Sequence, residues 1–269
     1  MRGSAPVTPL PSVPRARKAV LSLALCAGLA LSATACSAEE KPDPDQGTNG
    51  VGKLAAPQIE TRARAAADAA KAVRLSGTLV SKGGTFKLDM RLKDGGGTGS
   101  VTSQKDTFEL LRIGDDLYLK ADASFWTHQD DGKQGGGKGG ASDRADQEAA
   151  GKLGGKYVKV PQGDPAYNEF HGFTDMDVLL EGLLDMEGTL SKGERTKVGG
   201  VRTIKVQAAD GAGGVLDVAL VGKPYPVQFA RAGGKGVLTL AEWDADFELA
   251  APPKAATVDY GGQLPQGDG

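Results

Sequence analysis

Cysteine is scarce in this sequence, and its placement excludes a disulfide framework. Cys26 lies inside an apolar run, Cys36 comes shortly after that run, and no cysteine follows in the remaining 233 residues. The part of the chain after Cys36 must therefore fold without internal disulfides. A chain of about 200 residues can bury enough apolar surface to do so.

The sequence also lacks a long apolar run near its start. The run from Ala19 to Leu31 has 13 residues, which is too short for a stable helix across a bilayer. Arg15, Arg17 and Lys18 precede it, and small residues follow it. This three-part plan is typical of an export signal. We therefore predict that residues 1–35 are a signal peptide that the mature protein lacks.

Cys36 stands directly after this segment, preceded by Ala33-Thr34-Ala35. These residues resemble the lipobox of bacterial lipoproteins, in which the cysteine is acylated and becomes the first residue, although leucine is commonest where Ala33 stands. Cys26 is a poorer candidate because bulky Leu25 precedes it. At about 0.8 kcal/mol per buried methylene, two or three acyl chains would hold the protein on the extracytoplasmic face of the cell membrane. The alternative is an ordinary secretory signal with an incidental cysteine.

Basic residues are not in excess. Beyond residue 35 the chain has 28 basic and 34 acidic residues, a net charge of about −6. Nucleic-acid binding normally needs a basic stripe. We therefore expect no nucleic-acid partner.

Catalytic and metal-binding patterns are also missing. The only histidines, His128 and His171, have no H-E-x-x-H spacing, and no G-x-S-x-G elbow occurs. The glycine-rich stretch 132–140 matches G-x-G-x-x-G and the start of a Walker A loop, but Gly139 stands where Ser or Thr is required and no buried strand precedes it. We predict a surface insertion, mobile over residues 130–145, and a protein that is not an enzyme and has no cofactor or metal.

The chain after Cys36 begins with a polar stretch and then changes to a helical pattern. Residues 36–52 are rich in Glu, Pro, Asp and Gly, which predicts a flexible tether. The alanine-rich stretch from Leu54 to Val73 predicts a first helix. Its narrow apolar face would comprise Ile59, Ala63, Ala66, Ala70 and Val73.

Alternation with a period of two dominates the rest of the sequence. Phe86, Leu88, Met90 and Leu92 alternate with charged residues, as in a strand with one buried face. Similar runs occur at 106–113, 116–121, 156–161, 201–208, 215–221, 226–232, 236–243 and 246–250. Paired glycines and Asp-Gly steps between them favour hairpin turns. The pattern predicts an α+β fold with an antiparallel meander of about ten strands.

One further helix is predicted within the meander, from Asp175 or Asp177 to Met186, with an acidic residue capping its start. Its apolar side would carry Val178, Leu179, Leu183, Leu184 and Met186. This side needs an apolar surface to cover. The face that carries Phe86, Leu88, Met90 and Leu92 is available.

The order of these elements resembles a known family. The resemblance rests on "GDDLYLK" after a strand, "GKYVKV" before the helical segment, "VGGVRTIKV" after it, and a tryptophan-containing strand that leads into "APP". In these features the chain is similar to the actinobacterial lipoproteins LppX, LprA, LprF and LprG, and more distantly to the LolA/LolB carriers. The resemblance covers roughly Leu54 to Tyr260 and implies a half-barrel, in which a strongly curved antiparallel sheet has helices across its concave face. We predict one domain over residues 53–260, with residues 261–269 as a disordered tail.

The resemblance also implies an apolar cavity for the acyl chains of lipids or lipoglycans. The candidate cavity-lining residues are Phe86, Leu88, Met90, Leu92, Phe108, Leu110, Leu117, Leu119, Leu179, Leu183 and Leu184. We expect a monomer that carries or presents lipid, with an envelope transporter as a candidate partner. The alternative is an envelope interaction or sensor module without a ligand, which would have a tightly filled core.

Overall fold

The computed structural model describes residues 43–259, except 82–83, 104–105 and 129–141. The predicted signal peptide, Cys36, the predicted tail 261–269 and most of the insertion 130–145 lie outside these residues. Within the part of the chain that is described, no helix is both long enough and apolar enough to cross a membrane.

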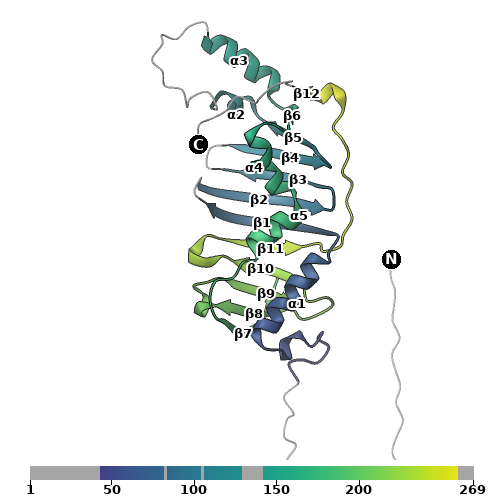
Figure 1. Cartoon of the computed structure of the whole chain (residues 1–269), viewed down its shortest axis with the longest axis vertical. Helices are drawn as coiled ribbons and strands as arrows, with labels where there is room; N and C mark the ends of the chain where they lie inside the picture. The colour runs from purple at the N-terminus through teal and green to yellow at the C-terminus, as the bar shows by residue number, and fades with distance from the viewer. Residues whose placement is uncertain (1–42, 82–83, 104–105, 129–141, 260–269) are drawn as a thin grey trace, which may run out of the picture. The chain divides into compact units, whose positions relative to one another are not determined.

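The described residues contain twelve strands in one open sheet (Figure 1). The order across the sheet is β12-β6-β5-β4-β3-β2-β1-β11-β10-β9-β8-β7, and all neighbours are antiparallel except β12 and β6. The strands are β1 (Ala72–Ser81), β2 (Gly84–Lys93), β3 (Gly96–Thr102), β4 (Thr107–Ile113), β5 (Asp116–Ala121), β6 (Tyr157–Val160), β7 (Leu190–Val198), β8 (Val201–Ala208), β9 (Val215–Ala219), β10 (Pro226–Ala230), β11 (Gly236–Ala241) and β12 (Thr257–Asp259). The predicted α+β class and antiparallel meander are confirmed.

The strand prediction is wrong in several places, because β1, β3, β7 and β12 were not among the predicted runs. Residues 246–250 alternate in sequence but form no strand, and β3 was not expected because its sequence, GGTGSVT, has a single apolar side chain. The glycines of β3 make room for the neighbouring elements. A Cβ on Gly97 would lie 2.6 Å from Leu92 Cδ2 and 3.1 Å from the carbonyl oxygen of Thr174.

Five helices occur in the described residues: α1 (Ala56–Asp68), α2 (Ala123–His128), α3 (Ser142–Leu153), α4 (Pro165–Thr174) and α5 (Met176–Leu183). Helices α1, α4 and α5 cover one face of the sheet (Figure 1). Helix α1 lies against β7 to β10, and α4 lies against β3 to β5. The predicted surface insertion therefore includes helix from Ser142 onward.

The predicted first helix is too long. It ends at Asp68, and Val73 belongs to β1, where it pairs with Leu92 of β2. Alanine favours helix throughout this stretch. From Ala72 onward, however, the backbone pairs with β2, and these hydrogen bonds outweigh the local helix preference. The buried side of α1 is Ala56, Ile59, Ala63 and Ala67, so the predicted Ala66 is only half-buried.

The predicted tether is also too long, because residues 43–52 are packed on the sheet. Asn49 Nδ2 donates to the carbonyl oxygens of Ala219 and Gly222, each at 3.0 Å. Val51 is buried at the start of a short 3-10 helix, Val51–Lys53. The first described residues are therefore fixed at the end of β9.

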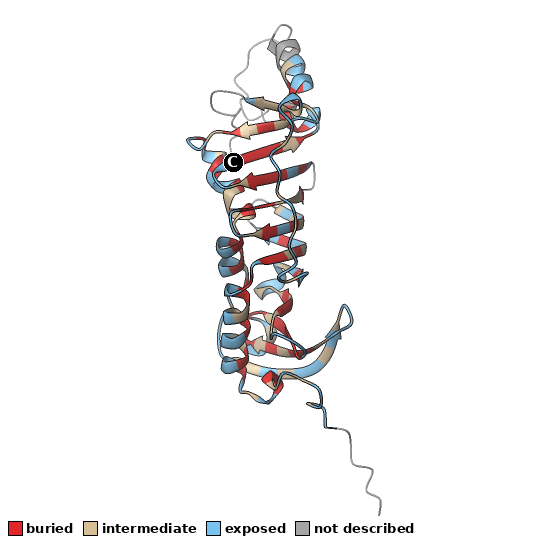
Figure 2. Cartoon of the chain, turned by 90° about the vertical axis from the view of Figure 1, so that its right-hand side faces the viewer, coloured by how far each residue is buried: buried red, intermediate tan, exposed pale blue. Residues whose placement is uncertain are grey.

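Between the helices and the sheet lies one apolar cluster. It runs from β6 at one end to β8 at the other and takes in side chains from all the helices of the described residues. Figure 2 shows the result, with buried positions where the helices meet the sheet and exposed positions on their outer sides.

Candidate functional site

The structure brings the predicted strand residues together on the helix-covered face. Those on β2, β4 and β5 are buried in the single apolar cluster, and Phe86 is half-buried at its margin. Cross-strand pairing explains this, because Leu110 of β4 lies opposite Leu119 of β5, and Leu88 of β2 lies opposite Val101 of β3. Their role as cavity-lining residues stays a prediction.

The helical residues divide between the two sides of α5. Leu179 and Leu184 are buried in the cluster, whereas Val178 is 53% exposed, so its predicted place on the apolar side is wrong. Asp175 caps α5 by accepting from the N–H of Val178, and this start directs Met176 and Leu180 inward instead. The side chain of Leu183 lies outside what the structure describes.

Arg112 fixes the start of α5 to the sheet. It continues the inward series Phe108, Leu110 of β4 and is 6% exposed. Its guanidinium donates to Thr174 Oγ1 at 3.2 Å, to the Thr174 carbonyl at 3.0 Å, and to Asp175 Oδ2 at 3.2 Å. The sequence analysis missed this residue. The available signal was a charged side chain at a position where the alternation requires an apolar one.

Arg64 of α1 holds the other end of α5. Its Nη2 donates to the carbonyl of Leu184, which follows the last residue of α5, and its Nε pairs with Glu60. Helix α5 is thus held at its start by an arginine from the sheet and at its end by an arginine from α1. Both contacts are at the ends of α5, and neither involves the residues in its middle.

A seam separates α1 from α5. It contains a cavity of about 430 Å³. The lining residues are Arg64, Asp68, Asp177, Leu180, Glu181 and Leu184. Leu180 and Leu184 belong to the apolar cluster beneath, so the seam leads from a charged rim to apolar side chains.

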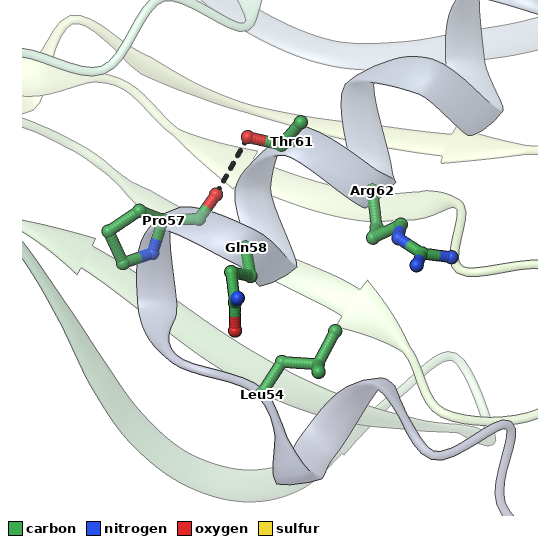
Figure 3. A pocket seen from close by; sticks show the side chains of 5 residues that line it. All are labelled: Leu54, Pro57, Gln58, Thr61 and Arg62. Atoms are coloured by element: carbon green, nitrogen blue, oxygen red, sulfur yellow. Dashed lines mark hydrogen bonds between the residues drawn. The ribbon is translucent and has the colours of Figure 1, made fainter.

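Two smaller hollows lie elsewhere on the helical layer. One of about 290 Å³ separates α4 from α5, where Phe173 and Leu179 line it. The other, of about 260 Å³, lies at the start of α1 between Leu54, Gln58 and Arg62 (Figure 3). There Thr61 Oγ1 donates to the carbonyl of Pro57 at 2.8 Å and holds the first turn.

Aromatic side chains fill the end of the cluster near α2. The Phe108 ring lies 5.5 Å from the rings of both Phe125 and Phe170, and Phe125 meets Trp126 edge-on at 5.1 Å. Trp126 is buried, and its Nε1 has no hydrogen-bond partner in the described residues. A buried donor without a partner is uncommon in folded proteins.

The described residues contain no group of three or more His, Cys, Asp or Glu side chains placed to hold a metal ion. His171 lies on α4 with its ring 5.7 Å from that of Tyr167. The side chain of His128 lies outside the description.

Comparison with known proteins gives structural neighbours only. No protein-family model and no curated protein matches the chain. Among solved structures, LprF from Mycobacterium bovis is 14% identical with a TM-score of 0.47, over 73% of this chain and 96% of that one. The lipoprotein LppX from Mycobacterium tuberculosis is 12% identical with a TM-score of 0.41, over 72% and 99%.

The structural neighbours thus include members of the family that the sequence resembles. A third neighbour is a putative outer membrane lipoprotein-sorting protein domain from Vibrio parahaemolyticus. It is 9% identical with a TM-score of 0.24, over 73% of this chain and 95% of that one.

Proposed function

We propose that this chain is a membrane-anchored lipoprotein that holds the acyl chains of a lipid or lipoglycan between its helices and its sheet, and carries or presents that lipid in the cell envelope. The observation that carries the proposal is the seam between α1 and α5. It leads from a charged rim to a continuous apolar layer. An acyl chain needs this sequence of surfaces, because its head group stays in water while its tail is buried.

The arrangement of the helices would let an acyl chain enter when α5 moves away from α1. Helix α1 rests on β7 to β10 and α4 rests on β3 to β5, so the two ends of the helical layer are seated on different parts of the sheet. Helix α5 bridges them through Arg112 and Arg64. Parting α5 from α1 would break few polar contacts and would expose Leu180 and Leu184 to an incoming chain.

Burial of apolar surface can bind an acyl chain without recognising its head group. An apolar layer contributes about 25 cal/mol for each square ångström removed from water, whatever the head group. The proposed role is binding and transfer, without catalysis.

Mass spectrometry of the protein purified without detergent tests the proposal. We expect diacyl or triacyl lipid to co-purify. Met90→Trp and Leu110→Trp, which place an indole among fully buried side chains, should abolish this lipid and the binding of a fluorescent fatty acid while the thermal midpoint stays near that of the wild type. Val80→Trp is the matched control. Val80 lies on the face of β1 that the helices do not cover, so this variant should retain lipid.

Two outcomes would overturn the proposal. If Met90→Trp and Leu110→Trp unfold the protein, the layer is a packed core. If the wild type carries no lipid and binds no probe, the ligandless interaction or sensor module should replace the lipid carrier.

A further inference from the structure

The face of the sheet opposite the helices carries an apolar groove at its β8 to β11 end. The groove encloses about 310 Å³. Val201 and Val221, two of its lining residues, are 39% and 53% exposed. A single exposed valine needs no explanation, but exposed apolar side chains that gather in one groove with a polar rim mark an interaction surface.

The groove arises because the ends of β8 and β9 carry apolar residues on the outer face as well as on the helical face. In β2, Leu88 and Met90 point to the helices, and Lys87 and Asp89 point outward. In β9, by contrast, Leu216 and Val218 are in the core cluster, while Ala219 lines the groove on the other side.

A β-bulge adds a further apolar side chain. The register of β10 with β9 shifts between Pro226 and Gln228, which leaves Val227 as the extra residue, and Val227 lines the groove. The outward apolar surface is therefore a feature of this end of the sheet, and the charged outer face of β2 lacks it.

Aromatic and charged side chains surround the groove, and Glu242 lines it together with Lys223. Tyr225 and Trp243 stack in parallel with their ring centroids 4.6 Å apart, and Trp243 Nε1 donates to the Pro226 carbonyl. Lys223 is at the same rim, where it contacts Tyr225 and Asp244. Apolar residues flanked by Trp, Tyr and Lys are characteristic of surfaces that lie in the headgroup region of a bilayer.

The start of the described chain lies at the same end of the sheet. Asn49 is bonded to the carbonyls of Ala219 and Gly222, and Arg202 of β8 donates to the carbonyls of Pro44 and Gln46. Seven residue steps join Asp43 to Cys36, a reach of at most about 25 Å however they are arranged. An anchor on Cys36 would therefore keep this end of the sheet close to the membrane.

We propose that the outer groove is a membrane-docking surface, in which Val201 and Val221 enter the headgroup region of the bilayer that anchors Cys36. This inference rests on the proposed anchoring of the chain. Docking in this way turns the helical layer and its seam away from the membrane, where the seam can present lipid to an acceptor. A single lipid attachment and a small apolar surface together bind a membrane more firmly than either alone.

Tryptophan fluorescence on vesicles tests this orientation. The acylated protein with Trp126→Phe keeps Trp243 as its only tryptophan. It is bound to phosphatidylcholine and phosphatidylglycerol vesicles in which part of the lipid carries bromine on its acyl chains. We expect strong quenching of Trp243. Adding Val201→Asp and Val221→Asp should remove most of the quenching, although the protein still sediments with the vesicles and still co-purifies with lipid.

Val80→Asp is the matched control, since Val80 lies on the outer face of β1, is 36% exposed and does not line the groove. It should leave the quenching unchanged. The proposal is overturned if Trp243 is not quenched in the parent protein, or if Val80→Asp reduces the quenching equally. It is also overturned if light scattering shows a dimer that the two aspartates convert to a monomer, because the groove would then bind a second copy. Failure to sediment with vesicles would refute the anchor, and this inference with it.

Discussion

The guanidinium of Arg112, buried on β4, lies 3.2 Å from the carboxylate of Asp175, which caps α5. The same guanidinium donates to both oxygens of Thr174, the last residue of α4. One side chain therefore holds the junction of two helices onto the sheet. The guanidinium is buried while the Asp175 side chain is 26% exposed, so removing Arg112 leaves the Thr174 carbonyl without its charged donor and Asp175 without its ion-pair partner.

Arg112→Met should destabilise the fold strongly. The variant removes the charged donor of the Thr174 carbonyl and the ion-pair partner of Asp175, so we expect a loss of about 1.5–3 kcal/mol. Urea unfolding measures the loss.

Asp175→Asn is the matched comparison. Asparagine still caps α5, and Arg112 keeps its carbonyl and hydroxyl acceptors, so the loss should be only about 1 kcal/mol. Equal losses in the two variants would show that Arg112 acts mainly through its charge pair with Asp175 and does not hold the junction as a whole.

The sequence was sufficient for the class of fold because the alternation in β2, β4 and β5 sets which face is buried. It was insufficient where backbone pairing decides the structure. Gly96–Thr102 has too few apolar side chains to reveal a strand, and nothing local shows that the helix stops at Asp68. A pattern of alternating apolar residues does not identify Arg112, because the informative feature is a charged residue at an inward position of β4.

Gly97→Ala should destabilise the protein by about 1–3 kcal/mol. Its Cβ would approach Leu92 Cδ2 to 2.6 Å and the backbone carbonyl oxygens of Arg91 and Thr174 to 3.1 Å, so the junction of α4 and α5 would have to move away from β3. Thermal unfolding checks this. Gly151→Ala in α3 is the control, because open space surrounds that position and alanine favours helix by about 1 kcal/mol.

Asp217 makes the stability of the fold depend on pH. It is 3% exposed, and burial raises the pKa of its carboxyl above the ordinary value of 3.8, although Thr203 Oγ1 donates to it at 3.0 Å. Because the folded state holds this proton more tightly than the unfolded state, the stability due to protonated Asp217 is lost as pH rises from about 3.8 through the raised pKa.

Asp217→Asn removes this ionisation and keeps an acceptor for Thr203. The variant should therefore gain stability relative to the wild type as the pH rises through that window. Urea unfolding of both proteins between pH 4 and pH 8 gives the difference. A difference that is constant over this range would contradict the assignment.

Cys36→Ala should release the protein from membranes into the medium, because the alanine variant has no thiol to acylate. Fractionation of cells followed by intact-mass measurement would detect both the release and the loss of the diacylglyceryl group. Cys26→Ala serves as the control and should leave the mature protein unchanged, since residues 1–35 are expected to be removed. Membrane association of Cys36→Ala at the level of the wild type would refute the anchor.

Arg64→Ala should make lipid exchange faster if the seam between α1 and α5 is the entrance. The variant removes the hydrogen bond from Arg64 to the carbonyl of Leu184, the polar contact that holds the end of α5 to α1. A hydrogen bond to a charged donor contributes about 1.5–3 kcal/mol, so the seam should open at least tenfold more often. Stopped-flow release of a fluorescent fatty acid measures the rate. Arg62→Ala, two residues earlier on the exposed side of α1, should leave the rate unchanged. If both variants release the probe at the rate of the wild type while still binding it, acyl chains enter elsewhere, and the hollow between α4 and α5 beside Phe173 becomes the entrance to test.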